Sequence, residues 1–484
     1  MSLRMAMVLA GIVLAGCSAR TSDPSSGATP GDAPSNPAAD APPSNTPAVA
    51  PQDTPAVAFP STYEPLPSQP TLIRNATILT AAGARIENGA ILMREGRIVE
   101  VGQDVSAPSG ANVIDGNGKW VTPGLIDTHS HLGVYPAPGV DAVSDGNEMV
   151  DPNTAEVWAE HSVWPQDPQF ELARAGGVTA MQILPGSANL FGGRGVTLKN
   201  VPSRTMQGMK FPGAPYGLKM ACGENPKRVY ASRGPATRMG NVAGYRAGWI
   251  RATKYRDQWR RWRANGEDPS TRPDRDLELE TLAGVLDGEI LVQNHCYRAD
   301  EMAVMIDIAR EFGYEIASFH HGVEAYKVRD LLAEHDICAS LWSDWWGFKL
   351  EAYDGIQQNI ALVDDAGACA IVHSDDAQGI QRLNQDAAKA MTAGTTMGMQ
   401  ITREDAIRWI TINPAKAIGV DDVTGSLEPG KHADIVLWTG DPFSVYTRAE
   451  KVFIDGALVF DLEDPSTHRK SDFLLGTTRK EVVR

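Results

Sequence analysis

The sequence predicts an α/β protein, a closed (β/α)8 barrel with a small β-sandwich that both ends of the chain build together. Short β-runs separated by turn residues occur in two terminal regions, 70–120 and 421–475. The stretch 121–420 between them alternates strand-like and helix-like segments. This alternation is typical of a parallel sheet, and a TIM barrel can occupy about 250 residues or more as one unit.

The terminal β-runs share alternating apolar residues and Gly-containing turns, Glu95-Gly96 in the first region and Asp455-Gly456 in the second. Because neither region is long enough for a core of its own, we expect them to pair with each other. The runs are 71–79, 89–101, 111–115, 434–438 and 451–460.

Composition excludes some classes of partner. The 484 residues are 42% hydrophobic and 21% charged, which is typical of a globular protein. Lysine and arginine number 44 against 60 aspartates and glutamates, so the net charge of −16 repels nucleic acid. One basic stretch, 245–263, interleaves arginines with tryptophans, and we interpret it as an amphipathic helix over the barrel.

The first 17 residues predict a lipoprotein signal peptide. Arg4 precedes an apolar run from Met5 to Ala15, which is too short to span a bilayer but suits an export signal. The following Gly16-Cys17 completes a segment that resembles the bacterial lipobox, which implies lipidation of Cys17. We therefore expect an exported protein anchored in the cell envelope, at the outer membrane facing the periplasm.

Residues 18–69 are dominated by Pro, Ala, Ser, Thr and Asp, which cannot offset the entropy of ordering, so a disordered tether is predicted there. Four further cysteines lie inside apolar segments at irregular spacing. That spacing favours buried thiols over a disulfide framework, although export would permit a bridge. They are Cys222, Cys296, Cys338 and Cys369.

The first strand of the barrel carries the most specific motif. Residues 121–133 read VTPGLIDTHSHLG, and His129 and His131 stand two apart. Residues i and i+2 of a strand face the same side, so both imidazoles can reach one metal ion. The string resembles the first-strand motif of the amidohydrolase superfamily. Residues 411–438 resemble the later segment of that superfamily in which the chain leaves the barrel, and the imidazolonepropionase-like and Xaa-Pro-dipeptidase-like branch looks closest.

This resemblance implies further metal ligands at the ends of later strands. Lys219 in YGLKMACG stands where relatives carry a carboxylated lysine that bridges two ions, with Glu224 as the alternative. His295 would end the fifth strand and Asp375 the eighth. In the sixth strand His320 and His321 are adjacent and point to opposite faces, so only one can face the metals. We prefer His321, because the run from His321 to Glu324 resembles the His-Gly-x-Glu run of the family.

Residues beside the expected ligands complete the predicted site. Asp375 is preferred to Asp376 because Ser374 directly before it fits the family pattern, and His373 is interpreted as a packing residue. Tyr297 and Arg298, just past His295, are expected to hold an anionic group of the substrate. A glycine-rich segment at 184–199 is expected to be a loop after the third strand, either a tight surface loop or one whose backbone N–H groups meet a substrate carboxylate.

These residue types predict hydrolysis of a small-molecule substrate. The implied cofactors are two divalent ions, with zinc expected, because such ions lower the pKa of bound water to about 7. Asp375 would be the catalytic acid and base. We expect a C–N bond in an amide, cyclic amide or dipeptide to be cleaved. A lactonase or phosphotriesterase, or a non-catalytic binding lipoprotein, is the alternative, and the sequence leaves a homo-oligomer open.

Overall fold

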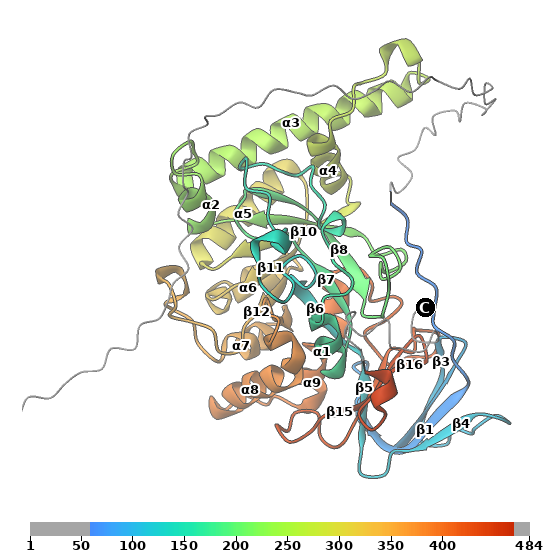
Figure 1. Cartoon of the computed structure of the whole chain (residues 1–484). Helices are drawn as coiled ribbons and strands as arrows, with labels where there is room; N and C mark the ends of the chain where they lie inside the picture. The colour runs from blue at the N-terminus through green and yellow to red at the C-terminus, as the bar shows by residue number, and fades with distance from the viewer. Residues whose placement is uncertain (1–58, 469–484) are drawn as a thin grey trace, which may run out of the picture. The chain divides into compact units, whose positions relative to one another are not determined.

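The computed structural model describes residues 59–468, and they form a barrel joined to a second sheet (Figure 1). The predicted signal peptide, Cys17 and residues 18–58 of the predicted tether lie outside the described residues. Residues 59–69 contact the folded body, because Lys210 Nζ donates to the Phe59 carbonyl at 2.7 Å and Tyr63 donates to Asp455 Oδ2. The part of the predicted tether from 59 onward is therefore part of the fold.

The barrel consists of eight strands in sequence order, and the sheet is nearly closed. Its strands are β6 (Leu125–Ser130), β7 (Val178–Ile183), β8 (Phe191–Lys199), β9 (Tyr216–Ala221), β10 (Ile290–Cys296), β11 (Ile316–His321), β12 (Cys338–Leu341) and β13 (Cys369–Val372). At the junction of the first and last strands, Asp375 N–H donates to the His129 carbonyl at 2.9 Å. The predicted eight-stranded barrel is therefore confirmed, with a sheet that is nearly closed.

Strand β8 departs from a regular parallel barrel, because it runs antiparallel to both β7 and β9. The link from β7 to β8 is too short for a crossover helix, so the chain turns back as a hairpin. Most of the segment expected to be a loop at 184–199 is therefore strand. A Cβ at Gly193 would lie 2.3 Å from the Val157 carbonyl oxygen, so the glycines admit a neighbouring segment to close contact.

The two chain ends pair in one eight-stranded sheet, where blue and red strands lie side by side in Figure 1. Strand β5 joins the ends, since it pairs with β1 and with β14. All strands belong to one hydrogen-bonded sheet, so the predicted β-sandwich is not confirmed. Its strands are β1 (Thr71–Ile78), β2 (Ile86–Arg94), β3 (Arg97–Gly102), β4 (Asn112–Asp115), β5 (Trp120–Pro123), β14 (Ile435–Trp438), β15 (Ala449–Ile454) and β16 (Ala457–Asp461).

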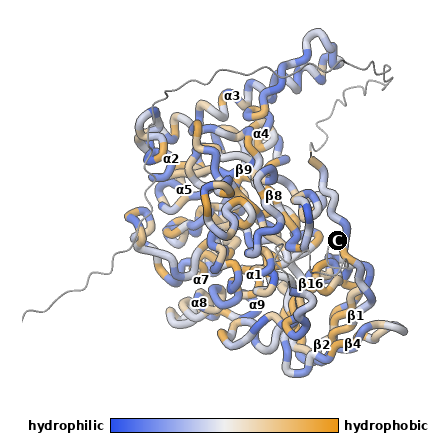
Figure 2. The backbone as a smooth tube through the Cα atoms, viewed as in Figure 1, coloured by the Kyte–Doolittle hydropathy of each residue, from blue (hydrophilic) through white to orange (hydrophobic). Residues whose placement is uncertain are grey.

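Helices cover the barrel (Figure 1). Figure 2 shows that the C-terminal end of the long helix α3, the end away from α2, is mainly hydrophilic. Helix α3 buries Tyr245, Trp249 and Tyr255 along one face, as predicted for the basic stretch. Within residues 59–468, no helix combines the length and apolarity needed to cross a membrane. The helices are α1 (Gln169–Ala175), α2 (Glu224–Val229), α3 (Arg238–Ala264), α4 (Leu277–Leu286), α5 (Ala299–Phe312), α6 (Arg329–Glu334), α7 (Asn359–Asp365), α8 (Leu383–Thr396), α9 (Arg403–Arg408) and α10 (Ile412–Ala417).

Candidate metal centre

The two histidines of the first strand meet the acid that follows the last strand. His129 lies near the end of β6 and is fully buried, and His131 follows the strand directly. Asp375 Oδ1 lies 3.4 Å from His129 Nε2 and 3.1 Å from His131 Nε2. The nitrogen and oxygen atoms of these three residues are close enough together to hold one metal ion.

Lys219 reaches the same point from β9. Its Nζ lies 2.9 Å from His129 Nε2, and the side chain is completely buried. Glu224, the alternative bridging residue, instead pairs with Lys349 at 3.3 Å. Of the two candidates, the structure therefore brings the lysine to the centre.

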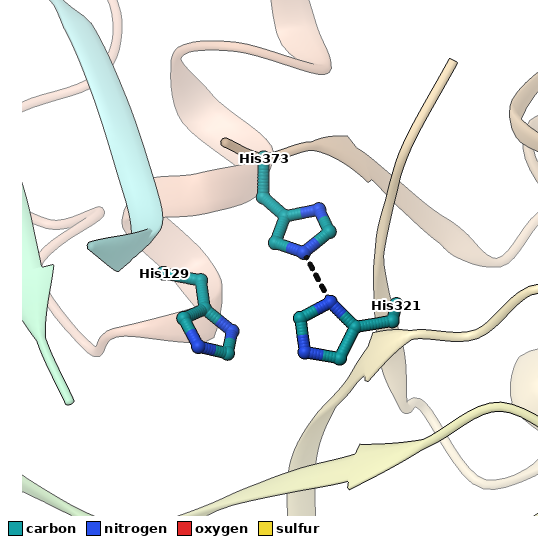
Figure 3. Close-up of side chains that lie close together, drawn as sticks. All are labelled: His129, His321 and His373. Atoms are coloured by element: carbon teal, nitrogen blue, oxygen red, sulfur yellow. Dashed lines mark hydrogen bonds between the residues drawn. The ribbon is translucent and has the colours of Figure 1, made fainter. Parts of the chain in front are cut away.

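A second group of possible ligands consists of His129, His321 and His373 (Figure 3). His373 Nε2 lies 2.9 Å from His321 Nδ1, and the rings turn towards His129. His373 was assigned to packing from the sequence. Its position directly after β13 and its adjacency to Asp375 were the signals that could have identified it as a possible ligand.

His295 completes the set from the end of β10. Its ring centroid lies 4.7 Å from that of His321, and its Nδ1 atom is buried without a hydrogen-bond partner among the described residues. Its Nε2 lies 3.4 Å from Asn225 Nδ2. The unpartnered nitrogen fits an imidazole placed to bind something that the protein does not supply.

The adjacent histidines of β11 do not separate as expected. The His320 and His321 rings both lie beside His129, with centroids 4.8 and 4.7 Å away. The reason is backbone geometry, because His321 has a φ of 71°, and this left-handed conformation ends the regular alternation of the strand. His320 then lies inside the barrel, while His321 lies among the other candidate ligands.

Buried carboxylates position the strand ends. Asp127, inside the quoted motif but overlooked as a functional residue, accepts hydrogen bonds from the backbone N–H groups of His129 at 3.2 Å and Ser374 at 3.1 Å. It thereby links the first strand of the barrel to the segment that follows the last strand, next to the candidate metal centre. Asp376 accepts from the N–H of Gln378 at 2.9 Å, which leaves Asp375 as the acid that faces the histidines.

Burial controls the charge of the centre. Desolvation lowers the pKa of the Lys219 amine to about 7 and that of His373 to about 4. Burial alone would raise the pKa of Asp375, but the hydrogen bond from His131 and nearby positive charge hold it below its ordinary value. Imidazoles, a carboxylate and a buried amine whose pKa is lowered are a donor set that suits zinc-like ions.

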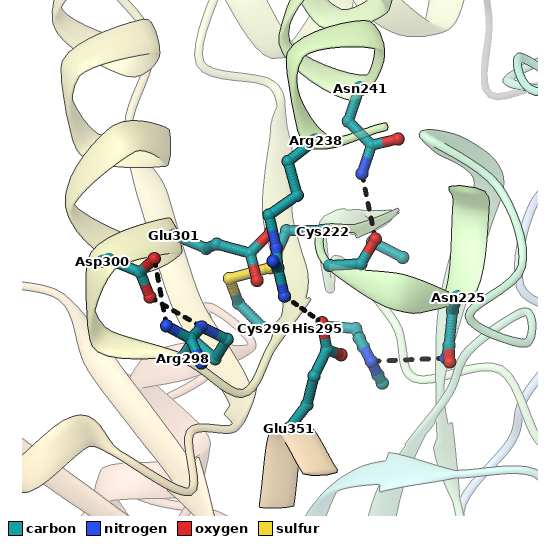
Figure 4. Close-up of a disulfide and its surroundings, with 12 residues drawn as sticks. Cys222, Asn225, Arg238, Asn241, His295, Cys296, Arg298, Asp300, Glu301 and Glu351 are labelled. Carbon is teal, nitrogen blue, oxygen red and sulfur yellow. Dashed lines mark hydrogen bonds and ion pairs between the residues drawn. A yellow bond between two sulfur atoms is a disulfide. The ribbon is translucent and has the colours of Figure 1, made fainter. Parts of the chain in front are cut away.

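A disulfide lies beside the centre (Figure 4). Cys222, just after β9, is bonded to Cys296 at the end of β10, and Cys338 is bonded to Cys369 between β12 and β13. The expectation of free buried thiols is therefore wrong. Irregular sequence spacing did not reveal the pairs because each bond joins neighbouring parallel strands that are distant in the chain.

The two predicted substrate-binding residues, Tyr297 and Arg298, lie in different surroundings. The Tyr297 ring lies 4.7 Å from the ring of His295 and 5.5 Å from that of His321, so it lines the centre. Arg298 instead donates to Asp300 at 2.9 Å and 3.3 Å and turns along its own loop (Figure 4). The structure brings Tyr297 to the centre but not the guanidinium of Arg298.

Imidazoles, a carboxylate and a buried lysine meet at the carboxyl ends of barrel strands, where TIM barrels carry their active sites, and they include groups that could hold a metal ion. Comparison with known proteins identifies the family. The model of the Amidohydrolase family matches residues 295–464. A solved amidohydrolase from Thermotoga maritima MSB8 is 36% identical, with a TM-score of 0.74, over 81% of this chain and 100% of that one. The chain belongs to the amidohydrolase family.

Curated relatives carry related names. The amidohydrolase tasK of Hapsidospora irregularis is 32% identical over 81% of this chain, although the match spans 43% of that longer protein. An imidazolonepropionase of Mesorhizobium japonicum is 25% identical over 75% of this chain and 91% of its own length.

Proposed function

We propose that the protein is a metal-dependent hydrolase that cleaves a C–N bond in an amide, a cyclic amide or a dipeptide-like substrate. The observation that carries this proposal is that six candidate ligands from the ends of five barrel strands lie side by side around His129 and His321. The proposed ligands are His129, His131, Lys219, His295, His321 and Asp375.

These residues fit a pair of divalent ions, and we propose zinc. His129, His131 and Asp375 would hold one ion, and His295 and His321 would hold the other. The uncharged amine of Lys219 can attack CO₂, forming an N–C bond and losing a proton, and the resulting carbamate would serve both sites. When bound, such ions polarise a carbonyl group and lower the pKa of water.

The protein's own residues then position the substrate and move the proton. Asp375 is partly buried against His129 and His131 and its pKa is held below the ordinary value, so it can take a proton from the attacking water and return it to the leaving nitrogen. Tyr297, which is 6% exposed, borders the same space and would orient the substrate.

Metal analysis and a substrate screen on the full chain test this proposal. N-acyl amino acids, Xaa-Pro dipeptides and lactones are offered to the protein as purified, after chelation and after zinc is restored. We expect amide turnover that chelation abolishes and zinc recovers. Turnover of esters alone would favour a lactonase or phosphotriesterase. A well-folded protein that binds no transition ion under any condition would overturn the proposal.

We also propose that the protein is exported and lipid-anchored at Cys17. Support comes from the two disulfides of the described barrel, since such bonds persist in oxidising compartments. Cells fed a labelled fatty acid should label the wild-type chain in the membrane fraction. Cys17→Ala should abolish the label, and equal labelling of both proteins would contradict the anchor.

A further inference from the structure

Four aromatic side chains form a connected cluster beside the candidate metal centre, and we call them the aromatic rim: Tyr297, Trp342, Trp345 and Phe348. Trp342 is the central member, because its ring centroid lies 5.1 Å from that of Trp345, 5.9 Å from Phe348 and 6.0 Å from Tyr297. Three of the four belong to the segment that directly follows β12.

The inner side of the rim touches the candidate ligands. The Trp342 ring stacks on His321, with centroids 4.3 Å apart, and on His373 at 5.3 Å. A cavity of about 80 Å³ is lined by Trp342, Trp345 and His373. Trp342 and His373 therefore connect the candidate ligands to the aromatic rim.

The outer side of the rim is open. Trp345 is 43% exposed and Phe348 is 56% exposed, whereas Trp342 is 9% exposed. Exposing large rings to water is unfavourable, and a group of them beside a site marks a place where an apolar partner binds. The buried inner member and the open outer members together form an aromatic wall that leads from the centre to solvent.

The same cavity is also lined by charged side chains, among them Asp344, Arg382, Asp386 and Lys389. Lys389 pairs with Asp344 and Asp386, each at 2.8 Å, so these charges satisfy one another. Ser343 Oγ is buried without a hydrogen-bond partner among the described residues, and it lines the cavity. This hydroxyl can fix one polar atom of a ligand whose remaining surface lies on the rings.

We propose that the aromatic rim is the substrate-side-chain subsite and that it selects substrates with an apolar, preferably aromatic, group next to the scissile C–N bond. This inference rests on the proposed function. The occupant is the substrate rather than a membrane or a second copy, because the rim continues into the ligand cluster through Trp342 and the shared cavity is small.

Kinetics on the full, metal-loaded chain provide the first test. N-acetylphenylalanine and N-acetylalanine, and the dipeptides Phe-Pro and Ala-Pro, place the ring on either side of the bond. Burying the extra ring should raise kcat/KM by roughly 10- to 100-fold for one pair, mainly through KM. In Trp345→Ala, the ratio of kcat/KM between the phenylalanine compound and the alanine compound should fall towards one. Tyr446→Ala, which removes an aromatic side chain that is 92% exposed, should leave the ratio unchanged.

Equilibrium binding separates this inference from the proposed function. Calorimetry with the same compounds is carried out at low temperature, where turnover is slow or absent. Tighter binding of the aromatic member, lost in Trp345→Ala but kept in Tyr446→Ala, supports the rim even if nothing is hydrolysed. If hydrolysis or binding shows no preference for the aromatic compounds, the assignment of the rim as a subsite is overturned and the proposed function still stands. A Trp345→Ala protein that changes oligomeric state, or stops binding lipid vesicles, would also overturn it.

Discussion

His129 Nδ1 lies 3.0 Å from His320 Nδ1, deep inside the barrel. The hydrogen positions follow from the neighbouring contacts. Gln293 Nε2 donates to the Ala417 carbonyl at 2.8 Å, so Gln293 Oε1 faces His320 Nε2 at 2.7 Å and accepts its hydrogen. Because burial keeps His320 uncharged, with its pKa well below the ordinary value, its Nδ1 accepts from His129. The lone pair of His129 Nε2 therefore points towards Lys219.

This chain of contacts predicts the effect of changing His320. In His320→Ala, His129 loses the acceptor that fixes its tautomer, and zinc affinity should fall by about 10- to 100-fold. His320→Asn offers a side-chain carbonyl near the same place and should recover most of that loss. Competition with a coloured chelator measures the affinities. His335→Ala, at the end of α6, is the control, and wild-type affinity in His320→Ala would contradict the assignment.

The sequence was most informative at strand ends. Lys219, His295 and Asp375 were expected as ligands from the resemblance to the amidohydrolase superfamily, at strand ends that meet at one face of the barrel. The structure places Lys219 and Asp375 beside His129, and His295 beside His321. The choice between Lys219 and Glu224 depended on motif position, and the salt bridge of Glu224 with Lys349 agrees with it. The family resemblance and the strand order together supplied this part of the predicted site.

The remaining features depend on contacts between distant segments. The antiparallel direction of β8 follows from a short hairpin that a glycine-rich pattern does not distinguish from a loop. The pairing of Cys222 with Cys296 depends on the lateral order of β9 and β10. The proximity of both β11 histidines to His129 depends on the positive φ of His321, which side-chain alternation cannot predict.

Asp375→Asn should separate binding from catalysis. The amide keeps an oxygen near His129 and His131, so the metal should remain, but it cannot take up a proton at neutral pH. We expect kcat to fall by about 10²- to 10⁴-fold. His129→Ala should instead lose the metal, because it removes a nitrogen shared by both candidate groups. Metal content and steady-state rates measured on the same samples test both changes, and an active Asp375→Asn enzyme would refute the acid–base role.

The disulfide beside the centre should affect metal binding as well as stability. Cys222 and Cys296 tie together the strands that carry Lys219 and His295. Replacing both cysteines with alanine should cost about 2–4 kcal/mol of unfolding free energy and weaken zinc binding. Replacing Cys338 and Cys369 should lower stability with less effect on zinc. Urea denaturation and chelator competition distinguish the two pairs, and equal zinc affinities would show that the first bond does not position the ligands.

A buried ion cluster between β8 and the terminal sheet predicts a pH dependence of stability. Lys199 Nζ lies 2.8 Å from Asp455 Oδ2 and 3.6 Å from Asp434 Oδ1. Burial alone would raise the pKa of Asp434, but the charge of Lys199 holds it below its ordinary value. The folded state therefore resists protonation more than the unfolded state does. This contribution is present above about pH 4, the unfolded value, and is lost as the pH falls below it.

Lys199→Met should reverse the direction in which the stability of this cluster changes with pH. Two buried carboxylates without their cation should cost about 3–5 kcal/mol at pH 7, and burial should now raise the pKa of Asp434. Folding of the variant then takes up protons, so its stability relative to wild type recovers as the pH falls from 7 towards 4. Urea denaturation of both metal-free proteins across this range measures the difference. Lys416→Met, which removes an exposed pair with Asp336, should show little difference at any pH. A Lys199→Met deficit that stays constant with pH would mean that the cluster acts through packing rather than charge.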